Sequence, residues 1–231
     1  MKEDFKDFIE ASGLLEYDPD TISKIYRKNP KRLFKRLWQT LIPIFAYIVS
    51  VGFDKITGKL KNESQARYRA KQLTALLVEL GPAFVKAGQA LSTRPDIIPV
   101  VLLEELSQLQ DQLPGFSGDK AMELIEKDLD KNIKDIFSKI DKEPISAASL
   151  GQVHKAILKD GEVVAVKVQR PGLREQITLD LYIVRNIAIW LKNNIGLIRS
   201  DLVALIDELG KRVFEEMDYI NEAENAEKFR D

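Results

Sequence analysis

The stretch that decides the fold is Ser146-Ala147-Ala148-Ser149-Leu150-Gly151-Gln152-Val153, followed farther on by Val164-Ala165-Val166-Lys167. Between them stands Asp160-Gly161, and an Asp-Gly pair between alternating apolar runs is a strong signal of a tight β-hairpin. Alternation in the second run places Ala165 and Lys167 on one face of a strand and the valines on the other. The pattern predicts a hairpin that packs its valine face into a core and presents a lysine on the opposite face.

The first run has the layout of a kinase nucleotide loop in which two glycines are replaced. Protein kinases cover the ATP phosphates with G-x-G-x-x-G-x-V and place a lysine on the third strand. Gly151 and Val153 keep the last two positions of this pattern, whereas Ser146 and Ala148 stand at the first two glycine positions. Because a Cβ atom restricts positive φ and keeps the backbone farther from a bound phosphate, the phosphate contacts should differ from those of an ordinary kinase.

The strand after the loop can meet a nucleotide on one face. Ala165 is small enough to leave room for an adenine ring, and the ammonium of Lys167 supplies a point charge for α- and β-phosphate oxygens. The alternative is a half-buried hairpin with a solvated lysine, which a lone Val-Ala-Val-Lys would favour. The loop upstream favours the nucleotide.

This alanine-containing loop, residues 144–154, resembles that of the UbiB family of atypical kinases. The same resemblance is carried by a K-x-G-Q-like segment at 84–89 that continues to 96, by residues 166–172, and by an E-x-D-like segment at 216–219 that continues to 225. Four segments in one order make chance a poor explanation. The resemblance implies an α+β fold: a protein-kinase-like small lobe, with a short antiparallel sheet and a helix C, preceded by a large helical extension.

The resemblance also implies a role for each matching residue. Lys167 and Glu222 would be the catalytic pair, with the glutamate on helix C. Lys86 would reach into the cleft, pair with the acidic element of Glu216 and Asp218, and so partly block a protein substrate. The nucleotide would contact positions on the loop and strands: Ser146, Ala147, Ala148, Ser149, Gly151, Val153, Ala165 and Lys167.

The K-x-G-Q-like segment can also be argued from helix geometry. Lys86 and Gln89 stand three residues apart and share a helix face. A glycine inside a helix costs about 1 kcal/mol relative to alanine, so Gly88 indicates that something approaches this helix closely. The alternative is a surface Lys/Gln pair beside a packing glycine. Through the resemblance we interpret these three residues as a regulatory motif.

The acidic segment has a helical pattern of its own. Glu215, Asp218 and Glu222 recur at intervals of three and four residues, which predicts that they share one helix face. Like charges so placed repel each other unless a cation faces them. The two motif lysines are the candidates, and a solvated acidic face is the alternative. Glu216 falls off this face, so its role rests on the motif alone.

Composition excludes several classes of function. The 231 residues carry a net charge of −1, are 45% hydrophobic and 31% charged, and include no cysteine and one histidine. The lack of cysteine excludes disulfides, thiolate metal sites and cysteine nucleophiles. No G-x-S-x-G segment accompanies the histidine, His154, so the sequence does not indicate a Ser-His-Asp hydrolase. Without a long basic face, nucleic acid is not an expected partner.

The amino-terminal region joins a basic cluster to an apolar run. Residues 1–10 lack the apolar core of a secretory signal, and the basic cluster at 27–36 leads into residues 37–53, which carry no charge. A membrane-spanning helix needs about 20 mainly apolar residues, so we do not expect this run, which Pro43 interrupts, to span a membrane. Its aromatic side chains either enter a membrane interface while the basic cluster meets anionic headgroups, or form a docking helix buried against the kinase lobe. The family's association with isoprenoid-quinone membranes favours the interface.

Local signals predict the other elements and a division of the chain. Helices are expected at 63–80, around Lys86 to about 92, at 101–112, from a cap at Asp119 to 128, and at 173–193; strands are expected at 138–140, 149–159 and 162–169. The proposed regions are a basic and apolar segment (1–60), a helical extension with the K-x-G-Q-like motif (61–137), and an incomplete small lobe with an inserted helix (138–231).

The segments that follow helix C in a kinase are not found here. They supply the catalytic aspartate, the metal-binding asparagine and the D-F-G aspartate, and none occurs up to Asp231. We therefore expect the amino-terminal part of a UbiB-like protein, without catalytic turnover of its own, without a metal site, and with Mg²⁺ ligands beyond residue 231.

The resemblance implies that the full-length protein is a kinase or ATPase that uses ATP and Mg²⁺. It would support isoprenoid-quinone synthesis or metabolism at a membrane, with an adenine nucleotide and a membrane lipid or quinone precursor as partners, as a cytoplasmic and peripheral membrane protein. The alternative from another class is a nucleotide-independent scaffold or lipid-binding module.

Overall fold

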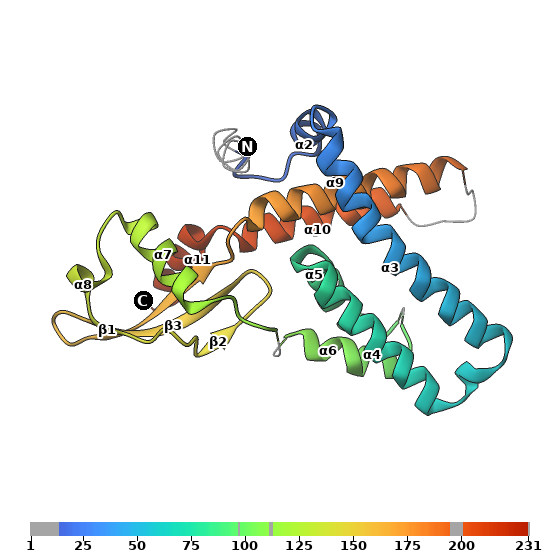
Figure 1. Cartoon of the computed structure of the whole chain (residues 1–231), viewed down its shortest axis with the longest axis horizontal. Helices are drawn as coiled ribbons and strands as arrows, with labels where there is room; N and C mark the ends of the chain where they lie inside the picture. The colour runs from blue at the N-terminus through green and yellow to red at the C-terminus, as the bar shows by residue number, and fades with distance from the viewer. Residues whose placement is uncertain (1–13, 97, 111–112, 195–200, 231) are drawn as a thin grey trace.

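The computed structural model describes residues 14–96, 98–110, 113–194 and 201–230. Its elements are α2 (Pro19–Arg27), α3 (Pro30–Ile56), η1 (Lys59–Lys61), α4 (Glu63–Leu80), α5 (Pro82–Ser92), α6 (Val100–Ser107), η2 (Gln108–Gln110), α7 (Gly118–Leu129), α8 (Ile133–Ile136), β1 (Phe137–Ile140), β2 (Ser146–Ala147), β3 (Gly151–Leu158), β4 (Val163–Gln169), α9 (Leu173–Asn194), α10 (Leu202–Glu216) and α11 (Tyr219–Arg230). The sheet lies at one end of the molecule and the long helices at the other (Figure 1). The mostly helical chain with one small antiparallel sheet confirms the α+β class and is consistent with a kinase-like small lobe.

The four-stranded sheet is built on the predicted hairpin. β3 pairs antiparallel with β1, β2 and β4, and Val153 lies opposite Lys167 in the register. The hairpin turns at Asp160-Gly161, where Gly161 has φ +96°. Glycine adopts this left-handed conformation without a steric penalty, which explains the residue at the turn. The two-residue strand β2 was not predicted, because it is too short to show alternation.

α7 covers the valine face of the sheet. The buried side chains of this cluster are Ala121, Met122, Ile125, Phe137, Ala156 and Val168. Lys167 is exposed on the opposite face, as alternation predicted. The predicted cap of α7 is wrong, because the helix begins at Gly118 with Ser117 as its N-cap position. Asp119 lies in the first turn instead, 2.6 Å from the ammonium of Lys142.

α9 forms the centre of the helical part, as expected for the helix predicted at 173–193. It packs with α2 and α10 in an apolar cluster whose buried members include Ile22, Ile25, Tyr26, Ile177, Leu181, Ile183, Val213 and Phe214. The Tyr26 hydroxyl lies 2.7 Å from the Thr178 hydroxyl, so the buried phenol is hydrogen bonded. α2 is thereby fixed to α9.

α4 and α5 form the support of the K-x-G-Q-like segment. α4 begins and ends at the predicted residues, and α5 ends at Ser92 as expected. A Cβ atom on Gly88 would lie 2.6 Å from Leu109 Cδ1 and 2.8 Å from Leu77 Cδ1. The close approach inferred from this glycine is therefore the packing of α5 against α4 and η2. The end of the helix predicted at 101–112 and the segment 1–10 lie outside the described residues.

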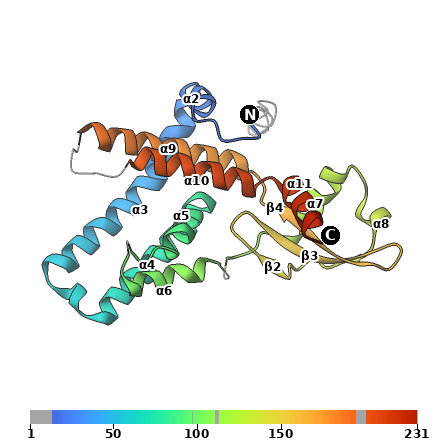
Figure 2. The same cartoon turned by 180° about the vertical axis from the view of Figure 1, so that it is seen from behind.

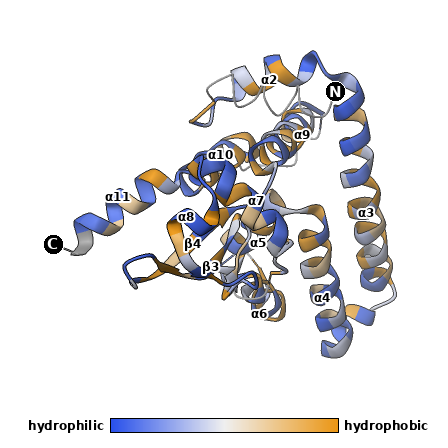
Figure 3. Cartoon of the chain, turned by 60° about the vertical axis from the view of Figure 1, so that its left-hand side comes forward, coloured by the Kyte–Doolittle hydropathy of each residue, from blue (hydrophilic) through white to orange (hydrophobic). Residues whose placement is uncertain are grey.

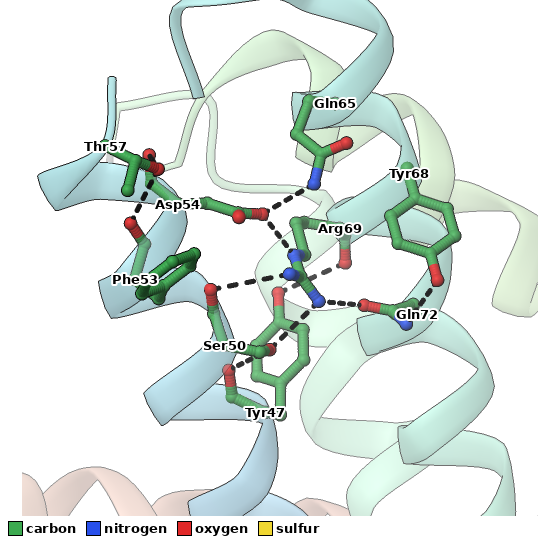
Figure 4. Close-up of polar contacts among 9 residues, drawn as sticks. All are labelled: Tyr47, Ser50, Phe53, Asp54, Thr57, Gln65, Tyr68, Arg69 and Gln72. Atoms are coloured by element: carbon green, nitrogen blue, oxygen red, sulfur yellow. Dashed lines mark hydrogen bonds and ion pairs between the residues drawn. The ribbon is translucent and has the colours of Figure 1, made fainter. Parts of the chain in front are cut away.

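α3 runs from α2 to the far end of the molecule, where η1 turns the chain back into α4 (Figures 1 and 2). Two ion pairs with buried carboxylates hold α3 in place. Arg36 Nε of α3 lies 2.6 Å from the carboxylate of Asp180 on α9. Arg69 Nε of α4 lies 2.6 Å from the carboxylate of Asp54 on α3 (Figure 4). α3 thus docks on α9 and α4 through these ion pairs, and Leu33 and Leu37 of α3 also pack against the apolar cluster around α9.

Much of the α3 surface away from these contacts is apolar and open. Its exposed large side chains are Phe34, Trp38, Ile42, Phe45, Ile48, Val49, Phe53 and Ile56. They lie on a helix at the edge of the molecule (Figure 3). Within the described residues, α3 alone has the length and apolar composition to cross a membrane, and 11% of its most apolar window is buried. Of the two alternatives for this segment, a membrane interface or a docking helix buried against the kinase lobe, the open apolar face is what the interface requires.

Candidate functional site

Lys167 is held by two residues at the start of α11. Its ammonium lies 2.6 Å from both carboxylate oxygens of Glu222 and 4.4 Å from the centre of the Tyr219 ring. The lysine projects from β4 because alternation turns it away from the valine core, and the first turn of α11 presents the glutamate. The two side chains are 41% and 54% exposed, so a ligand in solution can reach them. The structure brings together the pair that the resemblance implied.

A cleft of about 570 Å³ lies beside this pair, within the size range of small-molecule sites. Its lining comes from α5, the loop before β3, β4 and the two C-terminal helices: Lys86, Ala148, Ser149, Leu150, Gly151, Lys167, Arg212, Glu215, Glu216, Tyr219, Asn221, Glu222 and Asn225. The predicted nucleotide contacts in this lining are Ala148, Ser149, Gly151 and Lys167. The other predicted contacts lie in strands outside the lining: Ser146, Ala147, Val153 and Ala165.

The loop between β2 and β3 is closed by hydrogen bonds. The amide of Ala148 donates to the carbonyl of Gly151 at 2.8 Å. The Arg170 guanidinium donates to the carbonyl of Ala148 at 2.8 Å and to that of Pro114 at 2.6 Å. Burial lowers the pKa of Arg170, yet an arginine stays charged at neutral pH. Arg170, from the segment that follows the lysine, therefore fixes the outer side of the loop.

Of the three glycine positions in the loop pattern, only position 151 requires a glycine. A Cβ atom on Gly151 would lie 2.5 Å from both the Tyr219 hydroxyl and the Val168 carbonyl oxygen, so only glycine fits there. Asp130 is the one non-glycine residue with positive φ in the described ranges. Ser146 and Ala148 consequently hold ordinary backbone conformations, and their Cβ atoms introduce no backbone strain.

Lys86 reaches the cleft from α5 and forms an ion pair with Glu216 at the end of α10. The other motif residues support the surrounding backbone. Gln89 Nε2 donates to the carbonyl of Leu109 at 2.8 Å, and Asp218 Oδ1 accepts from the amide of Asn221 at 3.0 Å, which caps α11. The structure therefore brings Lys86 and Glu216 to the cleft, while it places Gln89 and Asp218 in local hydrogen bonds.

The single acidic helix face predicted from spacing is wrong. α10 ends at Glu216 and α11 begins at Tyr219, so helical periodicity does not continue from Glu215 to Glu222. Gln169 of β4 donates a hydrogen bond to the carbonyl of Met217 at 2.9 Å within this break. The break lets glutamates of two differently oriented helices line one cleft.

Sequence reasoning assigned no role to several residues of the cleft lining, among them Tyr219 and Arg212. Burial, followed by the charge of Glu222, raises the pKa of Tyr219 to about 12, so its hydroxyl keeps its proton at neutral pH. The position of Tyr219 directly after the E-x-D-like segment was the available signal. No comparable signal marked Arg212, an exposed helix arginine that pairs with Glu208.

The sole histidine has a structural environment. His154 is fully buried, its Nδ1 lies 2.8 Å from the carbonyl of Asp141, and its Nε2 lies 3.0 Å from the side-chain amide of Gln152. Gln152 in turn accepts from the amide of Phe116 at 2.8 Å. This network joins the sheet to the segment before α7, away from the cleft.

The comparisons with known proteins identify the family of the chain. The family model of the ABC1 atypical kinase-like domain matches residues 108–231, more than half of the chain. The chain belongs to the ABC1 atypical kinase-like family. This result confirms the resemblance to UbiB-type kinases drawn from the motifs.

Relatives extend the similarity to the helical part. Uncharacterized protein sll0005 of Synechocystis is 50% identical over 93% of this chain and 31% of its own length. An uncharacterized, chloroplastic aarF domain-containing protein kinase of Arabidopsis thaliana is 48% identical over 96% of this chain and 32% of its own. The solved complex of Rv3197 with erythromycin, from Mycobacterium tuberculosis, is 34% identical, with a TM-score of 0.41 over 72% of this chain and 41% of that one. The chain spans about a third of the length of the two curated relatives.

Proposed function

We propose that the chain binds an adenine nucleotide in the cleft, with the phosphates beside Gly151 and Lys167, as part of an atypical kinase or ATPase. The observation that carries this proposal is the placement of the Lys167 ammonium, held by Glu222 and the Tyr219 ring, directly next to a loop that has room only for glycine at position 151. A fixed ammonium beside a backbone loop that lines the same cleft is the arrangement that orients phosphoryl groups.

The charges of the cleft explain how binding would change it. Lys86 and Lys167 each face a carboxylate, so both cations are neutralised in the free chain. A polyphosphate would draw the Lys167 ammonium partly from Glu222 and would compete with Glu216 for Lys86. The Lys86–Glu216 pair spans the cleft between α5 and α10 and would restrict a bulky acceptor, in accord with the expected regulatory role.

Mg²⁺ has no evident ligand set of protein residues here. In the described ranges, no three His, Asp or Glu side chains are grouped so as to hold a metal ion. The cleft carboxylates of Glu216 and Glu222 are engaged by lysines. We therefore assign the metal no step at this site.

The acceptor of the phosphoryl group would be a small molecule such as an isoprenoid-quinone precursor, as the family resemblance implies.

Thermal shift with Mg-ATP tests the nucleotide proposal. A ligand at 100 times its Kd adds about 2.7 kcal/mol to stability, so the wild-type chain should melt several degrees higher with nucleotide. Lys167→Ala should abolish this rise. Lys155→Ala is the matched control, because Lys155 is an exposed lysine on β3 outside the cleft lining and should leave the rise unchanged. An equal rise in the wild-type and Lys167→Ala chains would refute the proposal, and no rise in the wild type would favour the nucleotide-independent scaffold.

A second function, binding to an anionic membrane surface, is favoured by α3. Its exposed apolar side chains recur at helical spacing along the whole helix. Lysines stand at both ends, with Lys31 and Lys35 in the first turns and Lys55 in the last. Asp54, the one acid in α3, is buried and paired with Arg69. A helix with a wide apolar face and cationic ends fits the interface of an anionic bilayer.

Vesicle sedimentation tests this surface. The chain should bind vesicles that contain anionic phospholipid and should bind neutral vesicles more weakly. Trp38→Ala combined with Phe45→Ala should remove most of the binding. Trp190→Ala is the control, because Trp190 is a similarly exposed tryptophan on α9. Equal losses in both variants, or concentration-dependent dimers in place of vesicle binding, would contradict the membrane assignment.

A further inference from the structure

The hydroxyl of Tyr219 is a buried polar group without a partner. In the described part of the chain it has no hydrogen bond, although its oxygen is shielded from solvent. Such a group is destabilising, because it has lost its bonds to water and gained none from the protein. Unsatisfied buried groups are rare in native proteins and call for a specific explanation.

Packing and charge explain the ring of Tyr219 but not its hydroxyl. The ring lies 4.4 Å from the Lys167 ammonium, a cation–π contact that phenylalanine would also supply. The hydroxyl adds an unsatisfied donor in the tightest part of the loop, where a Cβ atom on Gly151 would lie 2.5 Å from it. Phenylalanine would therefore serve the free chain better than tyrosine. The described residues supply no partner for the hydroxyl, so we look for one in a bound ligand.

The location of the hydroxyl indicates what that partner is. The hydroxyl adjoins the backbone of Gly151, and the Tyr219 ring contacts the ammonium of Lys167. Gly151 and Lys167 are the two residues assigned above to the phosphates. Its proton is retained at neutral pH, because burial raises the pKa of Tyr219 to about 12. The group is thus a donor, and the acceptor that belongs beside an ammonium is an anionic oxygen.

We propose that the Tyr219 hydroxyl donates a hydrogen bond to a phosphate oxygen of the bound nucleotide. This proposal rests on the proposed nucleotide function. Because Gly151 covers the hydroxyl in the free chain, the segment 149–151 has to move off it when the ligand enters. Tyr219 is then a ligand-binding residue through its hydroxyl and a positioning residue for Lys167 through its ring.

Tyr219→Phe separates these roles by two readouts of opposite direction. The melting temperature of the free variant should rise, since the orphaned hydroxyl is gone and the ring remains. Its affinity for ATP, measured by calorimetry, should fall roughly 10- to 100-fold, the range for loss of one hydrogen bond to a charged group. Tyr219→Leu, which also removes the cation–π contact, should weaken binding further.

Tyr47→Phe is the matched control. The Tyr47 hydroxyl donates to the carbonyl of Arg69 at 3.2 Å, so its removal should lower the melting temperature and leave ATP affinity unchanged. If Tyr219→Phe binds ATP as tightly as the wild type while Lys167→Ala does not bind, the hydroxyl proposal is wrong and the nucleotide site stands. If Tyr219→Phe is less stable than the wild type, the hydroxyl has a partner in the free chain and the argument fails. If the wild type binds no ATP, both proposals fail.

Discussion

Replacement of Arg36 by alanine should strongly destabilise the chain. Arg36 joins three helices: from α3 it donates two hydrogen bonds to Asp180 of α9, at 2.6 and 2.8 Å, and one to the carbonyl of Leu80 at the end of α4. The Asp180 side chain has no exposed surface. Removal of the arginine would leave a buried carboxylate without its cation.

The expected loss is about 3–5 kcal/mol, the usual cost of breaking a buried ion pair from one side. That is a large part of the roughly 5–15 kcal/mol by which folded domains are stable. Burial already raises the pKa of Asp180 above the usual 3.8 although Arg36 opposes the shift. The loss of stability in Arg36→Ala should become smaller as the pH falls toward the pKa of Asp180, because a protonated carboxyl needs no cation.

Urea unfolding followed by circular dichroism measures this effect. Arg212→Ala is the control, since the Arg212–Glu208 pair is exposed and should contribute no more than about 0.5 kcal/mol. Arg36→Ala combined with Asp180→Leu should recover part of the lost stability, because the stranded charge is then gone. A loss below about 1 kcal/mol in Arg36→Ala, or one equal to that in Arg212→Ala, would refute the reasoning.

Two other predictions concern the loop at Gly151 and the dependence of stability on acidic pH. Gly151→Ala should cost about 1–3 kcal/mol in urea unfolding, because its Cβ atom would meet the backbone oxygen of Val168, whereas Gly52→Ala inside α3, with nothing within 4 Å, should gain up to about 1 kcal/mol; an equal effect at both sites would contradict the steric account. Hydrogen bonds from Arg69 lower the pKa of Asp54 below 3.8, so this pair stabilises the chain above that pH and the contribution disappears as the pH falls through the lowered value. Asp54→Asn should therefore be less stable than the wild type at pH 7 but equal to it in strong acid, and a difference that persists at low pH would rule out the ionised pair as its cause.

Local patterns predicted the hairpin and the lysine face because both depend on near neighbours in the chain. The alternation of residues 163–169 and the Asp-Gly turn gave the register that leaves Lys167 exposed on β4. The Lys167–Glu222 contact joins residues 55 positions apart and could be anticipated only from the family motif. Periodicity alone could not reach it, since the break before Tyr219 resets the helical phase.

Other parts of the site depend on tertiary contacts that leave no local pattern. The role of Arg170 comes from the carbonyls of Ala148 and Pro114, which the fold brings together from two loops. Asp119 looked like a helix cap because it is an acid before an apolar run, but Ser117 occupies that position. The exposed face of α3 was visible as an apolar run, whereas the side that docks was decided by Asp180 and Arg69 on distant helices.

The hydrogen bond from Gln169 to the carbonyl of Met217 joins the sheet to the backbone between Glu216 and Glu222, the partners of the two motif lysines. It ties the junction of α10 and α11 to β4, with Glu216 at the end of α10 on one side of the junction and Glu222 in the first turn of α11 on the other. The carboxylates that face both motif lysines are therefore held from one point on the sheet. Loss of this one hydrogen bond would disturb both lysine pairs together.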